Sequence, residues 1–538
     1  MPDTTITDPF AERLALLANA SALTRGGLRG IEKESLRILR NGQLALTPHP
    51  RALGSALTHE LLTTDYSEAL LELVTPAEPD AAITLGRLDE LHRYACAALA
   101  RQGELLWNAS MPGQLPETDE GIPIAQYGTS NSGRLRHVYR VGLALRYGRT
   151  MQCIAGIHYN YSLDENVWRI LRAATPADIS AQDDQSEHYL ALIRNFRRTS
   201  WLLMYLFGAS PALDAGFLHG HAHTLDTFDT PDARTLYRPY ATSLRMSDLG
   251  YSNNTGQSAL HADYDTLRGY MQTLAQAVSE PYPPYEAIGT HRNGEWVQIN
   301  TNVLQIENEF YTTIRPKRVT QPGERPLHAL ATHGVQYVEV RCMDIDPFEP
   351  TGIALQTARF LDAFLLACAL KDSPPMPPAA SAEALRNFAL VTMEGRRPQL
   401  ELTRNGQRIP MQDWAASILR DIDKTAAALD AAQGGDEHAQ AVAAQRAKLA
   451  DATLTPSARV LQAMRDTQQG WLQFGLSQSA KHAADFLARP LDAETVQHFE
   501  TLARDSLDEQ ARRERSDTLS FDDFVAAYRA YVGNNFDV

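Results

Sequence analysis

Cysteine is scarce in this chain, and no long hydrophobic run is present. The 538 residues include only four cysteines, Cys96, Cys153, Cys342 and Cys368, which are widely spaced and form no CxxC motif. This excludes a disulfide framework or a zinc ribbon and favours a reducing, cytoplasmic location. The best apolar run, WLLMYLF, is far too short to span a membrane, and the acidic N-terminus, MPDTTITDPFAE, does not resemble a signal peptide.

An excess of positive charge is also lacking. The chain has 50 Lys and Arg residues against 65 Asp and Glu residues, a net charge of -15, so general nucleic-acid binding is not expected. A hydrophobic fraction of 44% and a charged fraction of 21% are those of a folded protein and argue against wholesale disorder. The length is sufficient for a large core and more than one structural unit.

The spacing of apolar residues predicts a mixed body followed by a helical part. The predicted helices cover residues 8–23, 81–102, 186–207, 258–280 and 350–372, and the predicted strands cover 30–39, 69–76, 153–163, 296–311 and 335–345. The Pro- and Ala-rich stretch 373–383 is the best linker candidate. We therefore predict an α+β catalytic core with a mainly antiparallel sheet over 1–400, and a helical C-terminal part over 401–538 packed on it.

The stretch GIEKESLRIL places two glutamates in a predicted strand. Glu32 and Glu34 share one face with Leu36, because side chains two residues apart in a strand project to the same side. Like charges on a partly buried face repel each other and are costly to desolvate. Either a cation lies beside these carboxylates or one of them is protonated.

Three further segments carry polar groups on faces that should be buried or line a cleft. Asp65 precedes ALLELVTP, which contains Glu72, while His158 lies in IAGIHYNYS and Glu339 in VQYVEVRCM. A single embedded acid is usually paired with a base, but acids on several segments together with a histidine indicate a site for a hard cation. Mg²⁺ takes oxygen ligands and usually shares them with substrate phosphates. Such an ion would remove the repulsion in GIEKESLRIL.

Basic residues that could bind phosphates follow in the chain. IRPKR contains Arg315, Lys317 and Arg318, and Arg341 shares a strand face with Glu339. A guanidinium suits phosphate or carboxylate, and phosphoryl transfer needs mainly positioning and charge neutralisation. We assign the three residues of IRPKR to ATP phosphates on their charge; a solvated surface turn is the alternative. GTSNSGRL, residues 128–135, lacks the Lys and Ser/Thr of a P-loop and is interpreted as a turn-rich substrate loop.

Many short motifs occur in an order that resembles the proteobacterial type of glutamate–cysteine ligase. They are GIEKESLR, LTTDYSEALLELVTP, AQYGTSNSGR, GIHYNYS, YLFGASPA, YATSLRMSDLGY, QINTNVLQIENEFY, IRPKR and YVEVRCMDIDPF. The resemblance runs from about residue 24 to about 370. It implies a glutamine synthetase-like core in which a curved sheet forms a funnel with surrounding helices. It also implies ATP-dependent ligation of the L-glutamate γ-carboxylate to the L-cysteine amine through γ-glutamyl phosphate, the first step of glutathione biosynthesis.

The resemblance implies roles for individual residues as well. The Mg²⁺ ligands, with Mn²⁺ as an alternative ion, would be Glu32, Glu34, Glu72, His158 and Glu339, with Asp65 as a weaker member. Arg341 would contact the transferring phosphoryl group and act with Glu339 in catalysis. The cysteine pocket would comprise Tyr139, Arg245, Tyr251 and Tyr311, with Gln152 and Ile154 on the neighbouring substrate wall. Glutathione is the expected feedback inhibitor, and the expected active form is a monomer.

Other functions remain open at the level of sequence. A metal-dependent kinase or guanidino-type phosphotransferase on a related fold would share the acids and Arg341, but it would not release free phosphate with an amine acceptor. Within the ligases, ammonia or another amine could replace cysteine, although the tyrosines favour a small, specific acceptor pocket. A non-enzymatic binding or scaffold protein would not need acids and a histidine spread over four strands, and its lack of ATP turnover with Mg²⁺ would distinguish it.

Overall fold

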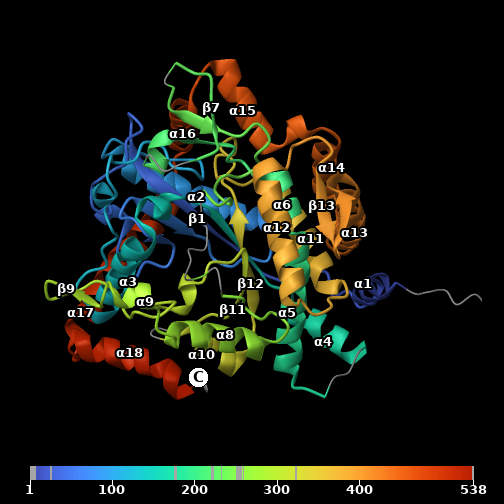
Figure 1. Cartoon of the computed structure of the whole chain (residues 1–538), viewed down its shortest axis with the longest axis horizontal. Coiled ribbons are helices and arrows are strands. Elements are labelled where there is room, and N and C mark those ends of the chain that lie inside the picture. The colour runs from blue at the N-terminus through green and yellow to red at the C-terminus, as the bar shows by residue number, and fades with distance from the viewer. Residues whose placement is uncertain are drawn as a thin grey trace, which may run out of the picture.

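The sheet at the centre of the molecule has seven strands and is antiparallel in every pair. The computed structural model describes residues 8–24, 27–174, 178–219, 223–231, 233–249, 257, 260–321 and 324–535. The strand order is β11-β12-β5-β1-β3-β2, with β4 paired to β1. The bounds are β1 Arg29–Leu39, β2 Leu62–Thr64, β3 Leu70–Val74, β4 Glu104–Leu106, β5 Ile157–Tyr161, β11 Ile314–Lys317 and β12 Tyr337–Met343. Helices surround the sheet (Figure 1), so the predicted α+β class and mainly antiparallel sheet are confirmed.

The pairing register gathers the predicted acids on one face of the sheet. Glu34 of β1 lies directly opposite Glu72 of β3, and Glu32 lies opposite His158 of β5. Glu339 of β12 lies opposite Asn160, two residues beyond His158 on the same strand. Residues opposite one another in a ladder share a face. The period-two reading of GIEKESLRIL therefore identified the face correctly.

The other face of β1 is buried too, and it carries two basic side chains. The Nζ of Lys33 donates to Asn108 Oδ1 at 2.7 Å, while Arg37 pairs with Glu104 of β4 at 2.7 Å between Nη1 and Oε2. Both basic side chains are almost inaccessible to solvent, and burial lowers the pKa of Lys33 to about 7. β1 is thus a largely buried strand with ionisable groups on both of its faces.

Helices of the body cover the sheet from several sides. Their bounds are α1 Pro9–Asn19, α2 Ala81–Ala100, α3 Asn131–Tyr147, α4 Glu165–Ala174, α5 Ala181–Thr199, α6 Trp201–Phe207, α8 Leu267–Ser279, α9 Pro283–Glu286, α10 Pro326–His333, α11 Leu355–Leu370 and α12 Pro378–Glu394. α5, α6, α11 and α12 lie side by side along one flank, and α3 lies across the sheet from them (Figure 1). The predicted linker is shorter than expected, because α12 begins within it.

The segment beyond residue 400 opens with a hairpin and continues as helices. The hairpin is β13 Glu401–Arg404 with β14 Gln407–Pro410, and the helices are α13 Met411–Gln433, α14 Glu437–Ala450, α15 Pro456–Thr467, α16 Trp471–Ala488, α17 Ala493–Ser516 and α18 Phe521–Asn535. α13 and α14 contact α11, α16 contacts α2, and α18 contacts α3. The division of the chain at residue 400 stays a prediction. Among the described helices, none is both long and apolar enough to cross a membrane.

Small sheets lie outside the central one, and the segment 296–311 beside one of them does not form the predicted strand. The three-stranded sheet comprises β6 Ala212–Asp214, β7 Asp226–Thr227 and β8 Thr235–Tyr237, and a hairpin joins β9 His291–Arg292 to β10 Glu295–Trp296. Most of 296–311, predicted as a strand, is irregular. Its side chains bond its own backbone: Ile299 N donates to Gln305 Oε1 at 3.0 Å, and Gln305 N donates to Glu309 Oε2 at 2.7 Å. These local bonds replace a strand ladder.

Candidate functional site

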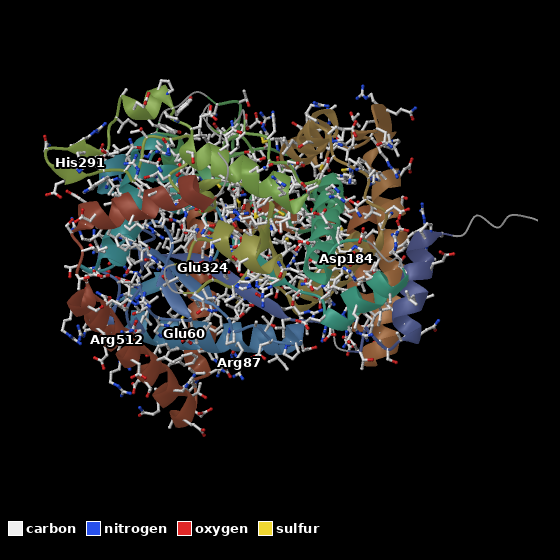
Figure 2. The ribbon with its side chains drawn as sticks, turned by 90° about the horizontal axis from the view of Figure 1, so that it is seen from below. Glu60, Arg87, Asp184, His291, Glu324 and Arg512 are labelled. Atoms are coloured by element: carbon white, nitrogen blue, oxygen red, sulfur yellow. The ribbon has the colours of Figure 1, made fainter. Side chains whose placement is uncertain are left out.

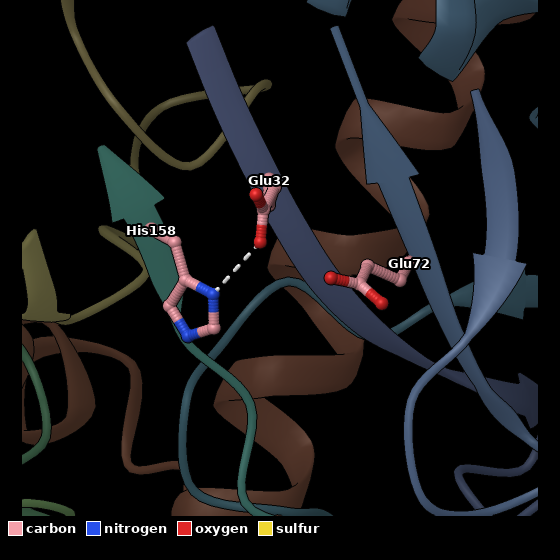
Figure 3. A group of neighbouring side chains, drawn as sticks. All are labelled: Glu32, Glu72 and His158. Atoms are coloured by element: carbon pink, nitrogen blue, oxygen red, sulfur yellow. Dashed lines mark hydrogen bonds and ion pairs between the residues drawn. The ribbon is translucent and has the colours of Figure 1, made fainter. Parts of the chain in front are cut away.

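Three side chains from three neighbouring strands face one another on the sheet. Ligand atoms of Glu32, Glu72 and His158 all lie within 4.8 Å of one another. Figure 3 shows the side chains converging from β1, β3 and β5, with His158 Nδ1 3.1 Å from Glu32 Oε2. The carboxylate of Glu72 points into the same space without contacting the other two. The three groups could therefore close around a cation.

Two more carboxylates adjoin this group through the histidine. His158 Nε2 lies 3.7 Å from Glu34 Oε1, and its Nδ1 lies 3.6 Å from Glu339 Oε1. The imidazole thus lies between carboxylates of β1 and β12. Asp65, which follows β2, is close enough for its charge to act on Glu34. The structure brings all six predicted metal-binding residues into one neighbourhood.

The pKa values of these acids are shifted in different directions, and a bound cation would lower all of them. Burial, followed by the charges of Glu32 and Asp65, raises the pKa of Glu72 well above its usual range, and burial likewise raises the pKa of Glu34. Burial also opposes ionisation of Glu32, but its hydrogen bond with His158 holds its pKa below the usual range. An added divalent cation would favour the ionised form of every member.

Basic side chains of β11 and β12 adjoin the acids. Arg341 Nη1 donates to Glu339 Oε1 at 3.1 Å, and Lys317 Nζ lies 3.6 Å from Glu339 Oε2. Burial opposes ionisation of Glu339, but the charges of Lys317 and Arg341 hold its pKa well below its usual range. Arg315 lies opposite Glu339 in the register. Arg318 alternates to the other side and donates to the carbonyl of His333, so it is not brought into the site.

The chemistry of the donor set fits Mg²⁺. Carboxylate oxygens come from several rigid strands, as a hard cation requires, and the buried Oε2 of Glu339 accepts no hydrogen bond from the described residues. The basic groups on β11 and β12 lie beside these acids, so they could bind an anion that such an ion also contacts. This arrangement suits a cation that is shared with a phosphate.

A cavity of about 300 Å³ opens beside the acids. The predicted residues that line it are Glu34, Asp65, Tyr139, Gln152, Tyr311, Arg315 and Arg341. Carboxylates, guanidinium groups and phenols therefore share one space. Burial raises the pKa of Tyr311 to about 12, so its phenol stays protonated and can donate a hydrogen bond at neutral pH.

Arg245 and Ile154 are buried next to the cavity and do not line it. Arg245 Nη2 donates to the carbonyl of Arg341 at 3.1 Å, and its guanidinium passes directly over Gly156. A Cβ at Gly156 would lie 1.9 Å from Arg245 Nη2, so only glycine leaves room for this approach. The same glycine donates its N–H to Glu34 Oε2 at 2.7 Å. Tyr251 lies outside the described residues.

The cavity contains residues that the sequence analysis missed. Arg140, Arg146 and Tyr147 reach it from α3, a helix that was not predicted. Tyr147 Oη donates to Glu309 Oε1 at 2.7 Å, and Arg146 Nη1 donates to the same oxygen at 3.0 Å. The signal that could have found them is their helical spacing with Tyr139, which places them on one face.

Comparison with known proteins gives a consistent result. A family model described as glutamate-cysteine ligase matches residues 14–391. The chain is 59% identical to a glutamate–cysteine ligase of Pseudomonas aeruginosa over 530 residues, covering 98% of this chain and 99% of the relative. It is 58% identical to the same enzyme of Azotobacter vinelandii over 533 residues, with the same two coverages.

Solved structures agree with the sequence comparisons. A glutamate–cysteine ligase from Francisella tularensis in complex with AMP has a TM-score of 0.88 and 35% identity, covering 94% of this chain and 98% of that one. A bifunctional glutathione synthetase from Pasteurella multocida, with a TM-score of 0.70 and 24% identity, shares the fold over 93% of this chain and 58% of that one. The predicted resemblance is thereby confirmed, and the chain belongs to the glutamate–cysteine ligase family.

Proposed function

We propose that the chain joins the γ-carboxylate of L-glutamate to the amine of L-cysteine at the expense of ATP. The observation that carries this proposal is that Glu34 and Arg341 line the same cavity. The carboxylates behind Glu34 suit a cation, and the guanidinium group suits the anions that must meet in the first step. Two negatively charged substrates, a carboxylate and a triphosphate, need such neutralisation on both sides.

The acids would hold the metal ion. Glu32, Glu34, Glu72, His158 and Glu339, with Asp65 beside them, would bind Mg²⁺ or Mn²⁺. When bound, the ion supplies charge neutralisation at the phosphate oxygens of ATP. The protein side chains would bind and orient the substrates.

In the first step, a γ-carboxylate oxygen of glutamate attacks the γ-phosphorus of ATP, and the bond to the ADP oxygen breaks. The product is γ-glutamyl phosphate, in which phosphate has become a leaving group. Arg341, held by Glu339, would bind the phosphoryl group in transfer, while Arg315 and Lys317 would bind ATP phosphates. We omit Arg318 because its guanidinium donates to the end of α10.

In the second step, the neutral amine of cysteine attacks the acyl carbon, the C–O bond to phosphate breaks, and the proton that the nitrogen loses ends on the released phosphate. Tyr139, Gln152 and Tyr311 line the cavity and would contact cysteine. Arg245, buried behind them, would act mainly by fixing the β12 backbone at Arg341. γ-Glutamylcysteine, ADP and phosphate are the products.

A coupled assay tests the proposal. The full-length protein with ATP, Mg²⁺ and glutamate should release phosphate only when cysteine is added, and mass analysis should identify γ-glutamylcysteine. EDTA should abolish turnover. Phosphate release that does not depend on cysteine, equal turnover with ammonia, or transfer of phosphate to a stable product would contradict the ligase assignment.

We further propose that glutathione inhibits competitively with glutamate and that the chain acts as a monomer. Glutathione carries both a γ-glutamyl and a cysteinyl group, the two parts that the proposed product also carries. The four cysteines are free and buried, which suits a reducing, cytoplasmic compartment. Inhibition that glutamate does not relieve, or an active species of twice the mass in sedimentation, would contradict these points.

A further inference from the structure

The N-terminal end of α3 is held by the C-terminal part of the chain. The backbone N–H of Thr129 donates to Glu514 Oε1 at 2.9 Å, and the N–H of Asn131 donates to Asp517 Oδ2. The side chain of Asn131 also donates to the carbonyl of Leu519 at 3.0 Å. Residues separated by almost 400 positions in sequence therefore meet at one turn. The helices α17 and α18 lie on the same side of the molecule as α3 in Figure 1.

The contact has the chemistry of a helix cap supplied from another element. The first N–H groups of a helix have no partner within it and carry partial positive charge, so carboxylates stabilise them. Ser130 caps α3 from within by accepting from Gly133 N, at 3.2 Å. Asp517, in the turn after α17, accepts from the N–H of Asn131, the first residue of α3. Glu514 of α17 accepts from the N–H of Thr129, which precedes the N-cap residue, and so holds the loop that enters the helix.

Close packing leaves the loop before α3 little freedom. Gly128 has φ +75°, and a Cβ there would lie 2.2 Å from both Gln510 Nε2 and Glu514 Oε1. Gln510 in turn donates to Glu514 at 3.0 Å and accepts from Ser55 Oγ at 2.5 Å. The loop GTSNSGRL is therefore pressed against a preformed set of side chains on α17.

α18 also packs against α3, next to the cavity residue Tyr139. Phe521 and Val525 of α18 form a small buried cluster with Val138 of α3, and Tyr139 packs against this cluster. The guanidinium of Arg134 lies 4.1 Å from the centre of the Phe521 ring. α3 thus has its first turn and its outer face fixed by α17 and α18.

α3 is the helix that projects Tyr139, Arg140, Arg146 and Tyr147 into the cavity. A shift or fraying of its first turn would move these groups, and a misplacement of about 1 Å can reduce a rate on the order of a hundredfold. We propose that Glu514 and Asp517 are positioning residues of the ligase site, acting through α3. This inference rests on the proposed placement of the amino-acid substrates beside α3.

The variant that tests this removes both carboxylates, as Glu514→Ala with Asp517→Ala. A conservative variant, Glu514→Gln with Asp517→Asn, keeps an acceptor oxygen at each position. The matched control is Asp505→Ala with Asp508→Ala, which removes two acids from the exposed side of the same helix. That side continues to Arg512, at the edge of the molecule in Figure 2.

Two measurements are made on the full-length proteins. The first is the KM for cysteine and for ATP, and the second is amide hydrogen exchange of residues 128–135 compared with β12. The alanine variant should raise the KM for cysteine about tenfold and leave the KM for ATP within about twofold, because no α3 residue is assigned to ATP. Exchange in 128–135 should accelerate while β12 stays protected. The conservative and control variants should behave as the parent protein.

Three outcomes would overturn the inference. Unchanged exchange and kinetics would show that the carboxylates do not hold α3. Faster exchange with an unchanged KM for cysteine would show that α3 does not need this support to position its side chains. An equal increase in the KM for cysteine and the KM for ATP, together with a lower unfolding temperature, would show that the two carboxylates stabilise the fold in general and do not position the site. Failure of the parent protein to make γ-glutamylcysteine would count against the proposed function, and in that case exchange in 128–135 alone decides whether the carboxylates hold α3.

Discussion

Glu339 occupies the point where the acids of the sheet meet the bases of β11 and β12. It contacts Arg341 at 3.1 Å and lies 3.6 Å from both Lys317 and His158. The residue therefore has two tasks, to contribute negative charge toward a cation and to orient the guanidinium that faces phosphate. Both depend on its charge and only weakly on its shape.

We expect Glu339→Gln to lower kcat at least about a hundredfold while the protein stays folded, because glutamine keeps the volume and loses the charge. Turnover at saturating Mg²⁺ measures the effect, and circular dichroism verifies the fold. Glu401→Gln, in an exposed pair with Arg408, is the control and should be fully active. Activity of Glu339→Gln within twofold of the parent would contradict the metal and phosphoryl assignments.

Gly156, in contrast to Glu339, matters for its size, since it leaves room for a neighbouring guanidinium group. Its missing side chain is what allows the Arg245 guanidinium to reach the carbonyl of Arg341. Gly156→Ala should displace that guanidinium and raise the KM for cysteine about tenfold, at a cost in stability of about 1–3 kcal/mol from overpacking. In an Arg245→Ala background the added methyl should have little further effect. Additive effects of the two changes would show that Gly156 and Arg245 act independently.

Among the elements, the sequence was most informative for strands with strict alternation. The period of two in GIEKESLRIL and VQYVEVRCM identified the faces that carry the acids, because a strand fixes side-chain direction locally. In 296–311 the same reasoning failed, since Gln and Glu side chains bond the backbone there in place of a neighbouring strand. Such a competition is decided by tertiary placement and is not visible in the spacing.

The strand β1 also illustrates a burial that alternation alone does not reveal. Arg37 and Glu104 are both fully buried between β1 and β4, and Arg37 also donates to Thr47 and to the carbonyl of Glu68. A buried ion pair contributes little net stability, but removing one partner leaves an uncompensated charge. From the sequence alone, Arg37 would be predicted to face solvent, because the sequence does not show that β4 covers it.

We therefore expect Glu104→Gln to lower the free energy of unfolding by about 3–5 kcal/mol, as measured by urea denaturation. The double variant Arg37→Met with Glu104→Leu removes both charges and should recover a large part of this loss. Glu401→Gln, whose partner Arg408 is exposed, should change stability by less than about 1 kcal/mol. A double variant that is less stable than Glu104→Gln would show that the pair itself is strongly favourable.

At the scale of the whole molecule, the C-terminal helices were the least predictable feature. Their periodicity indicated helices, but nothing in it indicated that Glu514 and Asp517 would bind backbone N–H groups at the start of α3 and just before it. Contacts between positions so distant in sequence depend on how the complete chain packs. The missed cavity residues of α3 belong to the same problem, because their role depends on a helix whose position is fixed by another part of the chain.

The same helix, α17, also contacts the segment around His59, whose titration should be visible in global stability. His59 Nδ1 accepts the N–H groups of Leu61 and Leu62, both at 3.0 Å, and its Nε2 is buried without a hydrogen-bond partner among the described residues. Thr58 donates to the carbonyl of Ser506 on α17. The ring must be neutral to accept two amides, and burial lowers its pKa to about 4.

Because the pKa of His59 is lower in the folded chain than its ordinary value of about 6.5, the unfolded chain binds the proton more tightly. The stability that His59 contributes is therefore complete above pH 6.5 and is lost as the pH falls toward 4. Lowering the pH from 7 to 5.5 should cost about 1 kcal/mol through this group alone, measured by urea unfolding at both pH values. His59→Asn, which can keep an acceptor without titrating, should remove that part of the pH dependence, and His498→Asn on the exposed surface of α17 should not. An unchanged pH dependence in His59→Asn would mean that the pKa of His59 is the same in the folded and the unfolded chain, which contradicts the effect of burial.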